Sequence, residues 1–226
     1  DETTILWQMP VLPIIVLWLL SSMLVKLVNR PLPSPRSEAP FEDVVFLRLI
    51  ARRTWNFFEN FVGPQDHWLP PDHFQESPNQ VIAHHTSPSN IGLFLTSAIG
   101  AYDLGYFDHL GLVARLETTM NTLTQLDRHR GHFLNWYNTQ TLEPLKPRYV
   151  STVDSGNLAI SLIIVSQTCK TISEKRVFRR EIWDGYMDNL TSLQEVLSSI
   201  KKAHPEFQTR ALLLSITTML DRIRSI

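Results

Sequence analysis

Apolar residues recur with helical spacing over most of the chain after its first forty residues. Ser87 followed by Pro88 is typical of a helix start, and Asp154 with Ser155 could cap another helix. Hardly any segment alternates apolar and polar residues as a half-buried strand does, so the fold class predicted for this part is all-α. The predicted helices cover residues 42–62, 88–105, 110–126, 181–203 and 205–226, with a further one starting at 154.

The N-terminal segment has a different pattern, because the run from Ile5 to Val25 contains no charged residue. At about 1.5 Å per residue such a run spans a hydrocarbon core of roughly 30 Å, which predicts a transmembrane helix within residues 1–28. A buried core helix is the alternative. Basic residues follow the run, so the positive-inside rule predicts that the C-terminal side is cytoplasmic. These residues are Lys26, Arg30 and Arg36.

The remaining organisation follows from proline content and charge. Residues 29–41 are rich in proline and are predicted to form a linker, and residues 42–226 form the helical domain. The formal net charge of −1 argues against a nucleic-acid partner, which would need clustered basic residues. The single cysteine, Cys169, excludes an intramolecular disulfide framework.

Two long loops separate the predicted helices and carry unusual chemistry. They run from Gly63 to Asn90 and from Arg130 to Asn157, and they combine aromatic residues with carboxylates and amides. Sugar sites need this mixture, because aromatic faces pack against sugar CH groups while carboxylates and amides bond the hydroxyls. The alternative is that the aromatic residues pack into the core and the carboxylates cap helices. For Asp154, which directly precedes an apolar helix, capping is a natural local role.

The histidines and the known nucleotide motifs suggest little further chemistry. His84 and His85 are adjacent, and His129 and His132 flank a glycine, so neither pair has the spacing of a familiar metal motif. The chain contains no GxGxxG, Walker or GxSxG sequence. We therefore expect no metal and no cofactor in this segment.

Three stretches of the chain resemble one family. They are LRLIARRTWNFFENFVGPQDHWLPPDHFQE, HHTSPSNIGLFLTSAIGAYDLGY and RGHFLNWYNTQTLEPLKPRYVSTVDSGNLA, which run in order between about Leu47 and Cys169. Together they resemble the central, glucoamylase-like region of the cyclic β-1,2-glucan synthases, which are very large membrane-bound bacterial enzymes. In this resemblance the N-terminal apolar helix corresponds to the last membrane span of the preceding glycosyltransferase part, which implies a bacterial inner membrane with the soluble part in the cytoplasm.

The resemblance implies a fold and a function. Residues 42–226 would form the N-terminal half of an (α/α)6 barrel, in a domain that cyclises linear β-1,2-glucan by transglycosylation. The catalytic glutamates would lie beyond Ile226, so no catalytic residue and no activity are expected of this segment alone. The expected partners are β-1,2-glucan, the lipid bilayer and the remainder of the same polypeptide. The substrate-facing residues implied by the matched stretches are Trp68, Asp72, Asn90, Asn135, Trp136, Tyr137, Asp154 and Asn157.

Two functional hypotheses follow. In the first, the chain is a fragment of such a synthase and contributes to a glucan-binding cleft. In the second, it is a stand-alone membrane-anchored carbohydrate-binding or scaffold protein without catalysis. We also expect Ser87, Gly92 and Gly156, which stand in the matched stretches, to shape turns.

Overall fold

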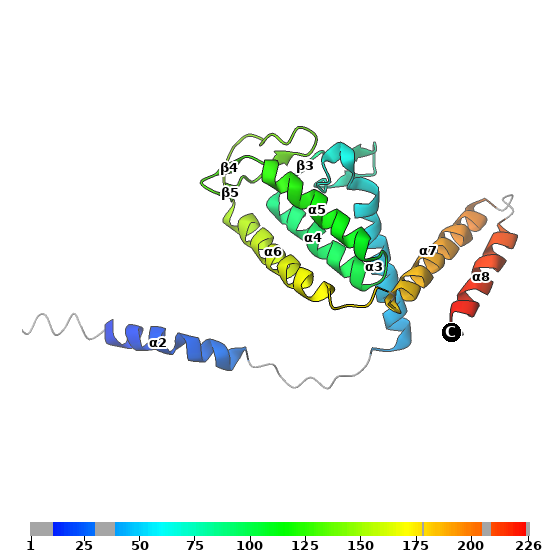
Figure 1. Cartoon of the computed structure of the whole chain (residues 1–226), viewed down its shortest axis with the longest axis horizontal. Helices are drawn as coiled ribbons and strands as arrows, with labels where there is room; N and C mark the ends of the chain where they lie inside the picture. The colour runs from blue at the N-terminus through cyan, green and yellow to red at the C-terminus, as the bar shows by residue number, and fades with distance from the viewer. Residues whose placement is uncertain (1–10, 30–38, 178, 205–208, 225–226) are drawn as a thin grey trace, which may run out of the picture. The chain divides into compact units, whose positions relative to one another are not determined.

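A computed structural model describes residues 11–29, 39–177, 179–204 and 209–224 (Figure 1). The chain divides into two compact units, residues 1–40 and 41–226. Most of the predicted linker lies outside the described residues. The half-barrel arrangement of the second unit stays a prediction.

The described part of the first unit is the helix α2 (Val11–Val28). Among the residues that the structure describes, no helix has both the length and the apolar character needed to cross a membrane. The predicted transmembrane helix is therefore wrong. The run from Ile5 to Pro10 lies outside the described residues, and α2 has 18 residues with Lys26 in its last turn. At about 1.5 Å per residue the described part of this helix reaches about 27 Å, less than the roughly 30 Å of a hydrocarbon core.

The second unit is built from helices joined by short turns and by two elaborate loops, which confirms the predicted helical class for its described residues. Helices α3 to α7 begin within two residues of their predicted starts. The helices are α3 (Phe41–Phe61), α4 (Pro88–Asp103), α5 (His109–Gln125), α6 (Thr152–Ile172), α7 (Glu181–Ala203) and α8 (Arg210–Arg224). Of the last predicted helix, residues 205–208 and 225–226 lie outside the described part.

Side-chain caps fix the starts of the two central helices. The hydroxyl of Ser87 accepts a hydrogen bond from the Asn90 backbone, and Pro88 occupies the first helical position of α4, as predicted. For α6 the prediction was wrong in detail, because Ser151 is the capping residue. Its hydroxyl accepts from the backbone nitrogen of Asp154, so Asp154 lies inside the first turn instead of capping it.

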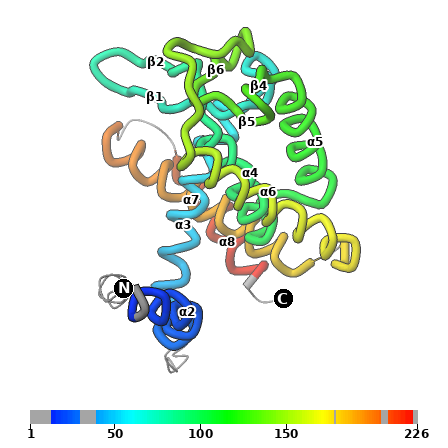
Figure 2. The backbone as a smooth tube through the Cα atoms, turned by 90° about the vertical axis from the view of Figure 1, so that its left-hand side faces the viewer, coloured from blue at the N-terminus to red at the C-terminus, as the bar shows by residue number. Residues whose placement is uncertain are grey.

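Helices α4 and α6 lie side by side and run in the same direction (Figures 1 and 2). Gly92 makes this close approach possible, because a Cβ there would lie 2.7 Å from the Ser161 hydroxyl and 3.3 Å from the Leu158 Cα. Gly92 therefore allows helix packing, and the expectation that it shapes a turn was wrong. Gly156 also lies within a helix, α6, and a Cβ there would meet no atom within 4 Å.

The main core fills the space between α3, α4, α5 and α6. It is centred on buried Trp55, whose ring lies 6.3 Å from that of Phe94 and nearly parallel to it. A smaller core joins α7 and α8 through Leu190, Leu197, Ile216 and Leu220. The helices thus form a packed support with the long loops gathered where α4 and α6 begin (Figure 1).

The long loops contain short elements that sequence periodicity did not predict. A 3-10 turn, η1 (Pro64–Asp66), opens the first loop. Each strand has two residues, and they pair antiparallel as β1 with β2, β3 with β6 and β4 with β5. The strands are β1 (Phe74–Gln75), β2 (Val81–Ile82), β3 (His85–Thr86), β4 (Arg128–His129), β5 (His132–Phe133) and β6 (Tyr137–Asn138).

Candidate sugar-binding site

The two long loops meet through the pairing of β3 with β6. His85 lies opposite Asn138 and Thr86 opposite Tyr137, and the Thr139 backbone nitrogen donates to the His84 carbonyl at 3.0 Å. These bonds join segments about fifty residues apart and hold both loops over the first turns of α4 and α6. Polar residues of the two loops are thereby brought to one end of the helix pair.

The first-loop carboxylate, Asp72, contacts the beginning of α4. Its Oδ1 accepts from the Asn90 side-chain amide at 2.8 Å, and its Oδ2 lies 2.9 Å from Nδ1 of His73 and 3.9 Å from Nε2 of His85. Burial raises the pKa of Asp72, but the hydrogen bonds from His73 and Asn90 and the nearby imidazole charges outweigh burial and lower this pKa overall. Asp72 is therefore ionised at neutral pH and partly exposed.

The second carboxylate, Asp154, contacts the same turn of α4 from the side of α6. Burial raises its pKa, but hydrogen bonds from Ser151, Ser89 and Ser87 lower it overall. Next to it, the Asn157 amide donates to the Ser89 hydroxyl at 2.9 Å. Two ionised carboxylates on two different elements thus flank one helix start.

Asn135 links Asp154 to the aromatic residues of the second loop. The side-chain amide of Asn135 forms hydrogen bonds with all of its polar neighbours when Nδ2 donates to Oδ2 of Asp154 at 2.9 Å. In that orientation Oδ1 accepts from the Trp136 indole nitrogen at 2.5 Å and from the Tyr149 hydroxyl at 2.7 Å. The Trp136 ring meets the His85 ring edge to face at a centroid distance of 5.2 Å, and His85 leads back to Asp72.

These contacts form one continuous arrangement, called here the loop–helix network. It contains six of the predicted residues and six residues that the sequence did not single out as substrate-facing. The predicted members are Asp72, Asn90, Asn135, Trp136, Asp154 and Asn157, and the others are His73, His85, Ser87, Ser89, Tyr149 and Ser151.

Two predicted residues lie apart from this network. Tyr137 has no exposed surface, and its hydroxyl donates to the Asp127 carbonyl at 2.7 Å while accepting from the Leu134 backbone at 2.6 Å. Its side chain supports the loop and offers no surface to a ligand. Trp68 is 37% exposed, and its carbonyl accepts from the Thr119 hydroxyl at 3.2 Å. Within the described residues no hydrogen bond or ring contact joins its side chain to the network, so its role stays a prediction.

A buried cluster around Asp66 holds the two loops together behind the network. Asp66 is 2% exposed, and its Oδ1 lies 2.5 Å from the Thr139 hydroxyl and 2.8 Å from Nδ1 of His84. His67 adds a 2.9 Å contact from Nδ1 to the Thr139 carbonyl. A buried carboxylate is stable only with such partners, and here its partners come from both loops.

Within the described ranges, no three or more His, Cys, Asp or Glu side chains are arranged to hold a metal ion. His129 and His132 lie opposite each other on β4 and β5, and His84 is engaged by Asp66.

Comparison with known proteins relates the chain to one curated relative, whereas no family model matches it. The chain is 40% identical over 191 residues to cyclic β-(1,2)-glucan synthase NdvB of Rhizobium meliloti. The match covers 84% of this chain but only 7% of the relative, so the chain corresponds to a small part of that protein.

Two solved structures show a weaker likeness. A candidate glucoamylase of Bacteroides fragilis is 20% identical with a TM-score of 0.48, and the match covers 60% of this chain and 33% of that one. A second, from Bacteroides caccae, is 17% identical with a TM-score of 0.47, over 71% of this chain and 39% of that one. These TM-scores are too low to support an argument about fold. The 40% identity with NdvB confirms the resemblance predicted from the sequence: over 84% of its length the chain is similar to a part of a cyclic β-(1,2)-glucan synthase.

Proposed function

We propose that the loop–helix network binds β-1,2-glucan and forms one wall of the sugar site in a domain that cyclises this glucan by transglycosylation. The single observation that carries the proposal is the continuity of the network. Side chains from both loops and from the first turns of α4 and α6 form one chain of contacts from Asp72 to Asn157. Relationship to a cyclic β-(1,2)-glucan synthase supports the choice of ligand.

The chemistry of the network suits a neutral, polyhydroxylated ligand. Asp72 and Asp154 have lowered pKa values, so both are ionised acceptors for hydroxyl groups at neutral pH. Amides and serine hydroxyls beside them can donate or accept as each sugar hydroxyl requires. Trp136 is partly exposed and contributes an aromatic surface for the CH groups of a glucose ring. The proposal assigns binding to these residues and bond cleavage to none of them.

A titration of the full chain with linear β-1,2-linked gluco-oligosaccharides tests the proposal. Tryptophan fluorescence should change on binding, and Trp136→Ala should weaken binding about tenfold or more, whereas Trp136→Phe, which keeps an aromatic face, should lose less. Asp154→Asn should weaken binding about tenfold to a hundredfold, because hydrogen bonds to charged groups contribute about 1.5–3 kcal/mol.

Two controls make the result specific. Trp183 lies on α7, is 57% exposed and is not part of the network, so Trp183→Ala should bind the oligosaccharide normally. Oligosaccharides with β-1,3 or β-1,4 linkages should bind more weakly than the β-1,2 series. If Trp136→Ala and Asp154→Asn both bound like the unaltered chain, the network would not be the sugar site.

A further inference from the structure

A basic hollow lies at the opposite end of the α4–α6 pair from the loop–helix network. It is lined by residues from the end of α4, from the segment between α6 and α7, and from the start of α7, and its volume is about 680 Å³. Four basic and two acidic side chains line it, which leaves a net charge of about +2 in a chain whose overall formal charge is −1. The lining residues are Asp103, Lys175, Arg176, Arg179, Arg180 and Glu181.

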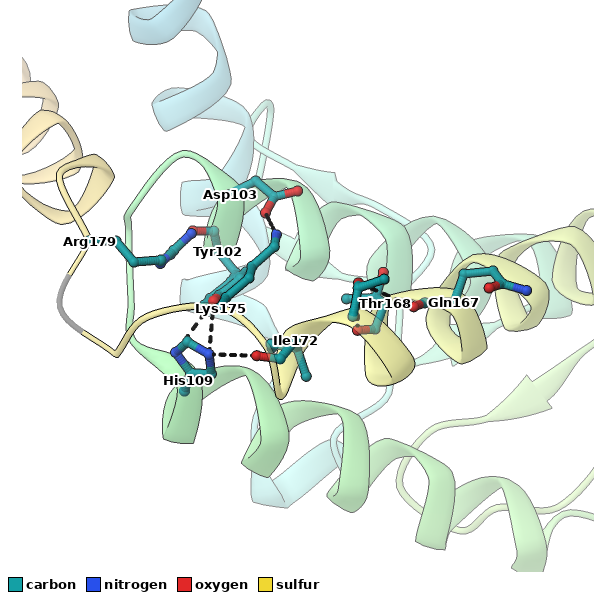
Figure 3. A network of polar contacts seen from close by, with 9 residues as sticks. Tyr102, Asp103, His109, Gln167, Thr168, Ile172, Lys175 and Arg179 are labelled. Atoms are coloured by element: carbon teal, nitrogen blue, oxygen red, sulfur yellow. Dashed lines mark hydrogen bonds and ion pairs between the residues drawn. The ribbon is translucent and has the colours of Figure 1, made fainter.

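Two of the basic residues are fixed on a rigid support (Figure 3). The Arg179 guanidinium lies 3.8 Å from the centroid of the Tyr102 ring, and its NH2 group donates to the Tyr102 carbonyl at 2.7 Å. Lys175 Nζ forms a 2.9 Å ion pair with Asp103. Tyr102 is fully buried, and its hydroxyl lies within 3.3 Å of both ring nitrogens of His109.

Part of the positive charge has no protein partner. Arg176 and Arg180 are exposed, and within the described residues neither has an acidic side chain or other acceptor in contact. In addition, Nε of Arg179 is buried and has no acceptor in the described structure. A buried donor without an acceptor is unfavourable, and arginines left unpaired around a hollow leave room for an external anion.

We propose that this hollow binds a phosphate group. Guanidinium groups match the oxygens of phosphate with paired hydrogen bonds, and three arginines within five positions of sequence supply such donors from one short segment. Arg179 is held in advance by Tyr102, so less side-chain freedom is lost when the anion binds. The same chemistry fits free phosphate, a small phosphorylated compound or the headgroup of an anionic phospholipid.

The test uses the full chain and two probes. Inorganic phosphate is titrated calorimetrically, and vesicles made of equal parts phosphatidylglycerol and phosphatidylcholine are assayed by co-sedimentation, with pure phosphatidylcholine vesicles beside them. The double variant Arg176→Ala/Arg180→Ala should bind the responding probe about 30-fold more weakly. Each of the two basic side chains contributes a factor of about five to the affinity for an anionic group. Raising the ionic strength from about 0.05 to about 0.5 M should also weaken binding.

The matched control removes the same charge at the far end of α7. Lys201 and Lys202 lie in the last turn of α7, and Lys201→Ala/Lys202→Ala should leave binding nearly unchanged. A response to phosphate identifies a soluble phosphate ligand, and a response to the anionic vesicles alone identifies a lipid headgroup. Failure of both probes, or an equal loss in the lysine variant, would overturn the proposal. The sugar titration is independent, because Arg176→Ala/Arg180→Ala leaves the loop–helix network intact.

Discussion

The contact between α4 and α6 at Gly92 makes a specific prediction about stability. In Gly92→Ala the new methyl group would lie 2.7 Å from the Ser161 Oγ and 3.3 Å from the Leu158 Cα, and the second of these is backbone. Overpacking of this kind costs about 1–3 kcal/mol, whereas replacing a mid-helix glycine by alanine gains about 1 kcal/mol in helix propensity. The difference is a net loss of up to about 2 kcal/mol in the free energy of unfolding.

A second glycine of α4 provides the control. A Cβ at Gly100 would meet nothing within 4 Å, so Gly100→Ala should stabilise the chain by about 0.5–1 kcal/mol. Urea unfolding of the full chain, followed by tryptophan fluorescence, measures both changes as shifts in the midpoint. The change Ser161→Gly removes the atom closest to the new methyl group. The double variant Gly92→Ala/Ser161→Gly should therefore lose about 1 kcal/mol less unfolding free energy than the sum of the two single variants. If Gly92→Ala were as stable as Gly100→Ala, the close approach of α4 and α6 would be wrong.

Three further predictions concern the loops. Asp66→Ala and Thr139→Val should each destabilise the chain in urea unfolding. The double variant should lose about 1–2 kcal/mol less than the sum of the two, because Thr139→Val removes the buried hydroxyl that Asp66→Ala leaves without an acceptor. Strictly additive losses would contradict this contact. The pKa values of Asp72 and Asp154 lie below the ordinary value of about 3.9. The contribution of the two carboxylates to stability and to sugar binding should therefore be complete above about pH 5 and lost as the pH falls through the lowered pKa values. A titration of sugar binding against pH measures this loss. In an intact synthase, the change corresponding to Trp136→Ala should lower the cyclic fraction of the glucan made from labelled UDP-glucose, with total glucose transfer nearly unchanged; a normal cyclic fraction would favour the core-packing interpretation of this loop.

The helices were predictable because the signals that form them are local. The apolar spacing of α3, α4 and α5 and the pair Ser87–Pro88 gave the starts of these elements within one or two residues. The start of α6 was less certain, since Ser151, Asp154 and Ser155 are all residues that can cap a helix. Only the geometry shows that Ser151 accepts the bond from the Asp154 backbone.

The arrangement of the loops depended on contacts that sequence periodicity does not encode. Strands of two residues are too short to show alternation, so the pairing of Thr86 with Tyr137 could not be predicted. The same pairing explains why Tyr137 is buried although Asn138, the next residue of β6, is partly exposed, because successive strand residues point to opposite faces. The aromatic and amide composition of the loops indicated a sugar-binding site. Which of these side chains lie together depends on the long-range pairing of the two loops.

Local composition was misleading at the N-terminus. The uncharged run from Ile5 to Val25 predicted a membrane span, but among the residues that the structure describes no helix is both long and apolar enough to cross a membrane, and α2 carries Lys26 in its last turn. A hydrophobic run gives apolar character, whereas a span also needs a helix of sufficient length.

The most direct measurement of the central claim is a structure of the full chain with a linear β-1,2-gluco-oligosaccharide bound. The account predicts a glucose ring within about 4 Å of the Trp136 ring, at ordinary van der Waals contact. It also predicts sugar hydroxyls within about 3 Å of the carboxylates of Asp72 and Asp154, the distance of a charge-assisted hydrogen bond. An oligosaccharide bound elsewhere on the chain, with these three side chains free of it, would contradict the assignment of the loop–helix network as the glucan site.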